Sequence, residues 1–325
     1  MKPSPAGDEP DAHLKGTLIS ALKRGLGSMP LQERLVGRGA LLPPALKIPS
    51  VTRILRIMNS TLPLNSEITT NLGIAGEGYR IVLPRTASDI ALFGTPMQYF
   101  GERGPLALAR ALCDRSDAFL DVGAHIGYFV FFVRGRGASL PIFYFEPNRT
   151  LFDCIEKNVR RNELGEVRGF CTAVGATSGR SKFYLDLTDP LSSSLTTFFA
   201  PQHQVSEIDV DVITIRDFLE TRSYQRLCVK VDVEAAEFQF LEGCEGVLDR
   251  LAYLIIELLG PAIQAGFVPA AISKGFHAYY INDFELVHST EGSFQYVAPQ
   301  YNWLFCREEP GTLKQLLAGA GLDVR

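Results

Sequence analysis

The sequence lacks the cysteine and histidine patterns that mark disulfide frameworks and zinc sites. Its 325 residues contain six cysteines, which are scattered without a CxxC pair or a neighbouring His/Cys cluster. This usage is typical of reduced, buried thiols, so we expect a cytoplasmic protein.

Long apolar runs are also absent. The most apolar stretch, residues 251–272, is interrupted by Glu257, Pro261 and Pro269, whereas a membrane span needs about 20 unbroken apolar residues. Residues 1–16 carry acids and prolines and no apolar h-region. We therefore expect neither a transmembrane segment nor a secretory signal.

An overall excess of basic residues is missing as well. Lys and Arg number 32 against 36 Asp and Glu, for a formal net charge of -4, so we expect no nucleic-acid partner. Residues 14–59, however, carry eight basic side chains against the single acid Glu33. They predict short helices with a basic face, either solvated and packed on the main domain or open to an anionic substrate, a lipid surface or a partner.

The length favours one main domain with an extension. We predict a disordered tail over 1–13, a basic helical N-terminal extension over 14–72, the main domain over 73–308, and a C-terminal tail or helix over 309–325.

Within the main domain, apolar strand-like runs alternate with stretches that can be helical. Such alternation predicts an α/β fold with a mostly parallel sheet built from right-handed crossovers. Aromatic runs near the end of the chain predict closing strands with an antiparallel pair. The expected strands are 119–122, 141–145, 167–174, 227–231 and 251–256, and the closing runs are 277–283, 284–289 and 302–307.

The run YFVFFV, residues 128–133, has the composition of a strand. We nevertheless predict a helix, because two adjacent parallel strands need a crossover of about a dozen residues and only 126–136 can supply it. A helix that is apolar on nearly all sides must be buried.

The stretch FLDVGAHIGYF, residues 119–129, predicts a ligand loop where the first strand ends. Gly123 and Gly127 would turn the chain into a helix at the carboxyl edge of the sheet, where open α/β folds bind ligands. Glu146 ends the next strand, from which a carboxylate can accept hydrogen bonds from both ribose hydroxyls of an adenosine cofactor. The alternative is a buried turn beside a surface glutamate.

The charge of this loop favours one adenosine cofactor over the others. The second glycine of the G-x-G-x-x-G fingerprint and the Walker A motif are both absent. S-adenosylmethionine (SAM) has no phosphate and carries a sulfonium and an ammonium, which suits the acid Asp121 just before the turn.

Five motifs in order resemble the FkbM-type SAM-dependent methyltransferases: FLDVGAHIGYF, YFEPNRTLFDCIEKN, AVGATSGRSKFYLD, VDVITIRDFL and VKVDVEAAEFQFLEG followed by LIIE. The likeness runs from about 95 to 257. It implies the class I methyltransferase Rossmann-like fold and O-methylation of a hydroxyl on a sugar, glycolipid or polyketide-type molecule. Two positions depart from the family, since His125 stands where asparagine is usual and Ala235 replaces a glycine.

The resemblance also implies roles for individual residues. Asp121, Gly123 and His125 would face the methionine part of SAM, Glu146 the ribose, and Ala173 with Val174 the adenine. A Y-x-x-E element that can fold over the cofactor matches Tyr99 and Glu102. The full set of implied cofactor contacts is Tyr99, Glu102, Asp121, Gly123, Ala124, His125, Gly127, Glu146, Ala173, Val174 and Asp232.

Lys230, Asp232 and Glu234 would end the fourth strand beside the transferring methyl. Asp232 is the first candidate to orient or deprotonate the acceptor hydroxyl and Glu234 the second; each could instead be structural, paired to Lys230 or capping a helix. Asp232 and Glu257 could also hold Mg²⁺ between adjacent strand ends.

The acceptor is expected to be a small molecule or glycan. The hydroxyl-rich and aromatic stretch 188–204 suits a polyhydroxylated ligand, or serves as a lid without selectivity. The alternatives are a non-catalytic binding or scaffold protein that keeps a methyltransferase fold, and a nucleic-acid methyltransferase that uses the basic N-terminal segment.

Overall fold

The computed structural model describes residues 67–74, 77–84, 103–135, 139–186, 193–197, 204–259, 262, 265–290 and 302–325. The predicted tail and the basic extension up to residue 66 lie outside this part of the chain. The chain divides into two compact units, residues 1–71 with 83–94 and residues 72–82 with 95–325. Most of the described residues belong to the second unit.

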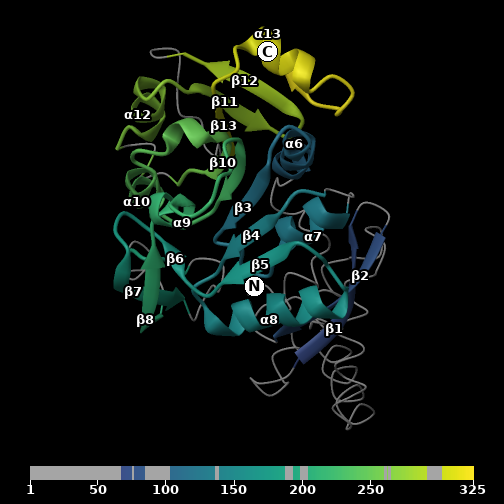
Figure 1. The fold of residues 1–325 in the computed structure, drawn as a ribbon, viewed down its shortest axis with the longest axis vertical. Helices are drawn as coiled ribbons and strands as arrows, with labels where there is room; N and C mark the ends of the chain where they lie inside the picture. The colour runs from purple at the N-terminus through teal and green to yellow at the C-terminus, as the bar shows by residue number, and fades with distance from the viewer. Residues whose placement is uncertain are drawn as a thin grey trace, which may run out of the picture. The chain divides into compact units, whose positions relative to one another are not determined.

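The second unit is built on a nine-stranded sheet (Figure 1). Its strands are β3 (Ala118–Val122), β4 (Ile142–Phe145), β5 (Val167–Phe170), β9 (Leu227–Val231), β10 (Leu251–Glu257), β11 (His277–Asn282), β12 (Glu285–Ser289), β13 (Asn302–Cys306) and β14 (Asp323–Val324). Their order is β14-β12-β11-β13-β10-β9-β3-β4-β5. The five strands from β10 to β5 are parallel, and β13 runs antiparallel between β10 and β11. The predicted α/β class with a mostly parallel sheet and an antiparallel closing pair is confirmed.

Helices cover both faces of this sheet, with α6 and α7 on one side and α9, α10 and α12 on the other (Figure 1). The helices are α6 (Arg103–Cys113), α7 (Tyr128–Gly135), α8 (Arg149–Arg161), α9 (Ile215–Leu219), α10 (Glu237–Gly243), α12 (Phe267–Ser273) and α13 (Pro310–Leu316), with a short 3₁₀ turn at Leu248–Arg250. The helix predicted for YFVFFV is confirmed as α7, in which all residues except Arg134 are buried. None of the described helices is long and apolar enough to cross a membrane.

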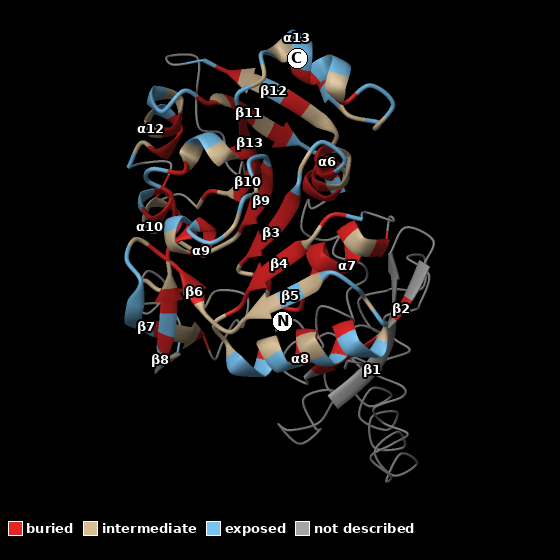
Figure 2. Cartoon of the chain, viewed as in Figure 1, coloured by how far each residue is buried: buried red, intermediate tan, exposed pale blue. Residues whose placement is uncertain are grey.

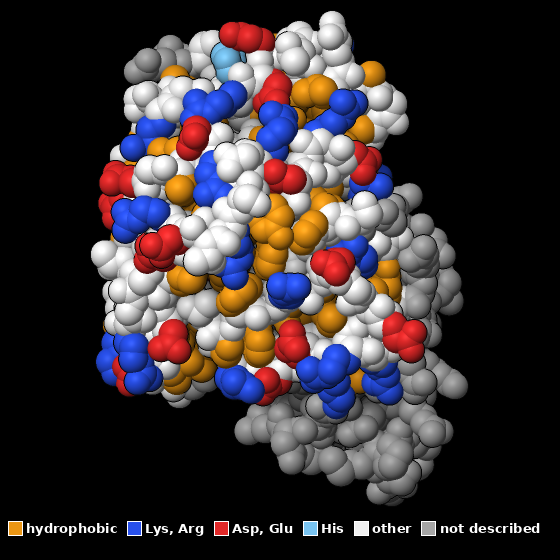
Figure 3. Space-filling model, viewed as in Figure 1, with side chains coloured by type: hydrophobic (Ala, Val, Ile, Leu, Met, Phe, Trp, Pro, Cys, Tyr) orange, Lys and Arg blue, Asp and Glu red, His pale blue; other side chains and the backbone are white. Residues whose placement is uncertain are grey.

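The central strands lie in the core, as Figure 2 shows. Every residue of β3, β4 and β9 is buried, which explains why their sequences are apolar runs rather than alternating patterns. On the outer surface, basic and acidic side chains are interspersed on the face seen in Figure 3. Val287, at 38% exposure, is the one large apolar side chain exposed among the described residues.

The single strand predicted over 167–174 is wrong. The chain breaks after β5, and β6 (Ala173–Val174) joins a separate three-stranded sheet of order β6-β8-β7 with β7 (Gly179–Asp186) and β8 (Val205–Ile213). As the edge strand of the main sheet, β5 is only partly buried. The chain leaves that edge at once to build the second sheet.

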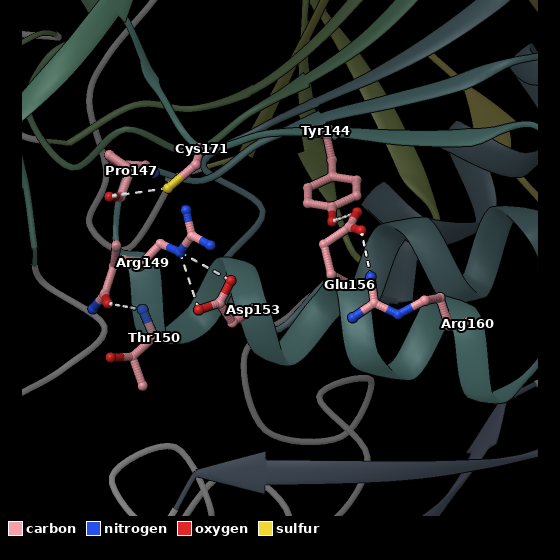
Figure 4. A network of polar contacts seen from close by, with 9 residues as sticks. Tyr144, Pro147, Arg149, Thr150, Asp153, Glu156, Arg160 and Cys171 are labelled. Carbon is pink, nitrogen blue, oxygen red and sulfur yellow. Dashed lines mark hydrogen bonds and ion pairs between the residues drawn. The ribbon is translucent and has the colours of Figure 1, made fainter.

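The side chain of Tyr144, in β4, lies over Gly169 of the edge strand and contacts helix α8 (Figure 4). Tyr144 pairs with Gly169 of β5, and its hydroxyl donates to Glu156 of α8 at 2.6 Å. Arg160 donates to the other oxygen of Glu156 at 3.0 Å. A Cβ on Gly169 would overlap the ring and hydroxyl of Tyr144, so this position of β5 must lack a side chain.

Gly169→Ala is therefore expected to lower the free energy of unfolding by about 1–3 kcal/mol, the usual effect of overpacking a well-filled site. Thermal or chemical denaturation measures it. Gly165→Ala is the matched control, because a Cβ there meets nothing within 4 Å. Equal stability of the two variants would contradict the packing explanation.

A buried asparagine joins strand β2 (Glu77–Pro84), which pairs with β1 (Glu67–Ile74), to helix α8. Asn158 is fully buried. Its amide donates to the carbonyl of Val82 at 2.8 Å and accepts from the N–H of Val82 at 2.7 Å. One side chain thus satisfies both backbone polar groups of the buried residue Val82, which would otherwise destabilise the fold.

Candidate active site

The site lies where the order of the parallel strands reverses. From β3 the chain moves outward through β4 to β5, then crosses back to place β9 on the other side of β3. Ligands of open α/β sheets bind in the crevice at such a switch point, beyond the carboxyl ends of the strands. Here those ends lead into the glycine loop, residues 123–127, and into the segment 232–236.

The two segments touch through their backbones. Gly123 has φ of +78°, and a Cβ on it would overlap the carbonyl oxygen of Asp232. The N–H of Asp232 in turn donates to the carbonyl of Val122 at 2.9 Å. The predicted cofactor loop and the predicted catalytic residues are therefore neighbours, and only glycine fits the contact between them.

The N–H groups of the glycine loop donate hydrogen bonds to acceptors within the protein. Those of Gly123 and Ala124 donate to the carbonyl of Phe145 at 3.0 and 3.1 Å. That of Gly127 donates to the carbonyl of Ala124 at 2.7 Å, and that of His125 to Glu146 at 2.8 Å. Phosphate loops instead aim their N–H groups at the ligand, so this loop suits a ligand without phosphate.

Glu146 is the polar centre of the site. It is 5% exposed, and its two oxygens accept hydrogen bonds from the N–H groups of His125 and Asn148, both at 2.8 Å. An ionised carboxylate offers about four acceptor positions, so about two remain for the two hydroxyls of a ribose. Burial and, to a smaller degree, the nearby Asp121 and Asp232 raise the pKa of Glu146 to about 8, against its two backbone hydrogen bonds.

Several carboxylates gather in this buried region, with one lysine among them. Asp121 is 3% exposed and pairs in register with Lys230 of the neighbouring strand. The Lys230 ammonium, 1% exposed, lies 3.6 Å from a carboxylate oxygen of Asp232 and 5.2 Å from the centre of the Phe129 ring. Such a surplus of negative charge favours a cationic ligand, which is what SAM is.

The segment after β9 has an unusual backbone. Glu234 and Ala235 have φ of +50° and +73°, and the Ala235 N–H donates to the Glu237 carboxylate at 3.0 Å. Burial, followed by the charges of Asp232, Glu257 and Glu237, raises the pKa of Glu234 to about 10. The raised pKa favours the protonated form of Glu234, which can donate a hydrogen bond.

The sequence model of the methyltransferase FkbM domain matches residues 121–285, which is half of the chain and contains both segments of the site. The chain belongs to the FkbM methyltransferase family. The predicted family is thereby confirmed, and the protein is a methyltransferase.

Individual relatives are more distant. The hexuronic acid methyltransferase AglP of Haloferax volcanii is 26% identical over 178 residues, covering 54% of this chain and 67% of that protein. Among solved structures, a putative methyltransferase, yhhF, from Escherichia coli is 13% identical, with 75% of this chain and 99% of that chain covered at a TM-score of 0.40. M. capricolum TrmK in complex with S-adenosyl-homocysteine is 12% identical, with 62% and 66% covered at a TM-score of 0.32. At these TM-scores the structures add nothing to the family assignment.

Both departures of this FkbM methyltransferase from its family lie at left-handed backbone positions. His125 has φ of +51°, and Ala235 has φ of +73°. Asparagine and glycine, the usual family residues, adopt this conformation more readily than most others. Ala235 fits this conformation less well than glycine would, so the surrounding contacts must hold it there.

Ala235→Gly is expected to raise the free energy of unfolding by about 0.5–1 kcal/mol, because glycine reaches positive φ without a Cβ clash. Denaturant titration measures the change. Ala270→Gly, inside helix α12, is expected to move stability the opposite way by a similar amount. A loss of stability in both variants would argue against strain at Ala235.

The predicted magnesium site at Asp232 and Glu257 is not supported. Over the residues that the structure describes, no group of three or more His, Cys, Asp or Glu side chains is placed to hold a metal ion. Glu257 ends β10 next to β9, as predicted, and it contributes to the site through its charge on Glu234.

The remaining predicted cofactor contacts stay predictions. Ala173 and Val174 form β6 and are buried, Val174 in the main core and Ala173 in the small core of the second sheet. Tyr99 and Glu102 lie outside the described residues. Ser194 was not predicted as a site residue, although its hydroxyl donates to the carbonyl of Val233 at 3.2 Å. The one feature of the sequence that points to it is its place in the hydroxyl-rich stretch 188–204.

Proposed function

We propose that this methyltransferase uses SAM as its donor and methylates a hydroxyl of a sugar, with a hexuronic acid as the favoured acceptor. The observation that carries the choice of donor is Glu146, a buried carboxylate that accepts one hydrogen bond on each oxygen. It lies beside a glycine loop whose N–H groups donate within the protein. The choice of acceptor is supported by the likeness to the Haloferax volcanii hexuronic acid methyltransferase. Glycolipid and polyketide-type hydroxyls are the other acceptors in this proposal.

In this proposal the cofactor is held by residues from β3, β4 and β6. Glu146 accepts hydrogen bonds from the ribose hydroxyls, Asp121 and the glycine loop face the methionine part, and Ala173 with Val174 contact the adenine. SAM supplies a methyl group already activated by its sulfonium. The protein's task is then to align an acceptor hydroxyl with that methyl and to exclude water.

Asp232 orients the acceptor hydroxyl and accepts its proton as the new bond forms. Its side chain is 33% exposed, so an acceptor can reach it, and Lys230 at 3.6 Å stabilises its charge. Glu234 is unsuited to the same role, because a carboxyl with a pKa of about 10 is already protonated at neutral pH. In this mechanism Glu234 donates a hydrogen bond within the site.

Two measurements test the proposal. Isothermal titration of the protein with SAM and with S-adenosylhomocysteine is expected to show one site per chain. Mass spectrometry of glycans from a deletion strain is expected to show a hexuronic acid that is lighter by one methyl. No heat and no thermal shift at millimolar SAM would favour a binding or scaffold protein that has lost catalysis, and unchanged glycans would remove the hexuronic acid acceptor.

A further inference from the structure

We infer that Ser194 is a positioning residue: its hydroxyl holds the carbonyl of Val233 and thereby fixes Asp232 and Glu234 in the site. This inference rests on the proposed function, because it assigns Ser194 to the same site. Ser194 is 2% exposed, and it comes from the connection between β7 and β8, a part of the chain remote in sequence from β9.

Ser194 is itself firmly held. It pairs with Tyr184 of β7 through two backbone hydrogen bonds, at 2.8 Å from the Tyr184 N–H and at 3.1 Å to the Tyr184 carbonyl. The next residue, Leu195, packs against the small core of the second sheet. The Ser194 hydroxyl therefore projects from a fixed backbone.

The carbonyl that it contacts lies between the two candidate catalytic carboxylates. Ser194 donates to the Val233 oxygen at 3.2 Å, and the N–H of Ala236 reaches the same oxygen at 3.3 Å. The Thr196 N–H donates to the Ser194 hydroxyl at 3.1 Å, and the Thr196 hydroxyl lies 3.3 Å from the same oxygen. When the Thr196 hydroxyl donates to Ser194, the Ser194 proton goes to the Val233 carbonyl.

This contact falls where the backbone needs support. The peptide that begins at Val233 leads into Glu234 and Ala235, both at left-handed φ. Non-glycine residues keep such a conformation only when surrounding contacts impose it. Among the described residues, the other hydrogen bonds and ion pairs of this segment come from the segment itself, from α10, from β3 and from Lys230 of β9. Ser194 is the contact from the second sheet, so it links that sheet to the carboxylates of the site.

Ser194→Ala should loosen the segment without removing a group that touches SAM or the acceptor. We expect amide hydrogen exchange over residues 232–241 to become faster by about three- to tenfold, the loss of one ordinary hydrogen bond. We expect kcat for methyl transfer from SAM to methyl glucuronide to fall by a similar factor, with the KM for SAM changed less than about twofold.

Ser193→Ala is the matched control. It removes the neighbouring hydroxyl, which accepts from the N–H of Asp186 in β7 at 3.0 Å and does not contact the segment 232–236. Exchange over 232–241 and kcat should stay at wild-type values in this variant. If Ser193→Ala and Ser194→Ala change exchange equally, Ser194 acts only on the stability of the second sheet and the inference is wrong.

A double variant separates positioning from general loosening. Ala235→Gly removes the strain at one of the two left-handed positions, so in that background Ser194→Ala should lose about half of its effect on exchange. An undiminished effect would overturn the inference. If the wild-type chain binds SAM but does not methylate methyl glucuronide, the acceptor proposal fails, and the exchange measurements still decide the role of Ser194.

Discussion

Glu146→Gln is expected to remove the proton release that accompanies SAM binding at pH 7. Glu146 is largely protonated in the cofactor-free protein, because burial raises its pKa to about 8. Two ribose hydroxyls that donate to it, and a sulfonium nearby, favour the ionised form. Binding should therefore release about one proton per SAM, and the affinity should rise with pH up to about 8.

Isothermal titration in two buffers of different ionisation enthalpy measures this proton release. Glutamine keeps the shape of the side chain and cannot ionise, so the variant reports any protons released by other groups, including the SAM ammonium. Glu146→Ala should weaken SAM binding on the order of 100-fold, since it removes acceptors of charge-assisted hydrogen bonds. Equal proton release by the wild type and Glu146→Gln would exclude Glu146 from the cofactor site.

The same carboxyl makes stability depend on pH. The pKa of Glu146 is about 8 in the folded chain, against 4.5 for an unperturbed glutamate as in the unfolded chain. Between pH 4.5 and pH 8 the folded chain therefore binds more protons at Glu146 than the unfolded chain does. The contribution of Glu146 to the free energy of unfolding is therefore fully present below pH 4.5 and is lost as the pH rises through 8. Bound SAM should reduce this loss, because it stabilises the ionised form.

Asp232→Asn is expected to lower kcat on the order of 10²- to 10⁴-fold, the usual contribution of general acid–base catalysis. Asparagine keeps the size of the side chain but accepts a proton far less readily. The affinity for SAM should change only a few-fold, because Glu146, Asp121 and the glycine loop remain. Initial rates with the uronic acid acceptor, together with SAM titration, measure both quantities.

Glu234→Gln is the matched control for Asp232→Asn. The raised pKa of Glu234 favours its protonated form at pH 7, so glutamine should reproduce its shape and its hydrogen-bond donor, and kcat should stay within a few-fold of the wild type. Full activity of Asp232→Asn, or an equal loss in both variants, would remove Asp232 from its role as the base.

The mostly parallel sheet and its crossover helices could be predicted, because the alternation of strand-like and helical stretches has a geometric consequence. Helix α7 has the composition of a strand, yet the crossover between β3 and β4 left no other segment to supply a helix. Asp121, Gly123, Glu146 and Asp232 were brought together by the same reasoning, since parallel strands end at one edge. Their roles toward SAM and the acceptor stay predictions.

The second sheet could not be predicted in the same way. β7 is exposed on one face, where Lys182 lies 3.0 Å from carboxylate oxygens of both Glu207 and Asp209 of β8. Residues 179–213 therefore lack the apolar runs that identify the strands of the main sheet. The contact that places Ser194 at the site joins it to Val233, 39 residues later in the chain. The local periodicity of apolar residues does not reveal such a contact.

Backbone strain was also beyond local reasoning. The sequence identifies His125 and Ala235 as unusual for the family, but one sequence does not reveal φ. The structure places both residues at left-handed φ, shortly after the end of a switch-point strand.

The Asn158 contact bears on which part of the chain can fold by itself. The FkbM match begins at residue 121. The buried amide of Asn158 forms its hydrogen bonds with Val82, which lies 39 residues before the start of that match. A truncation at the start of the match would leave that amide facing a cavity and would uncover one side of α8. We therefore expect that a fragment able to fold by itself must extend beyond the matched residues and include β2.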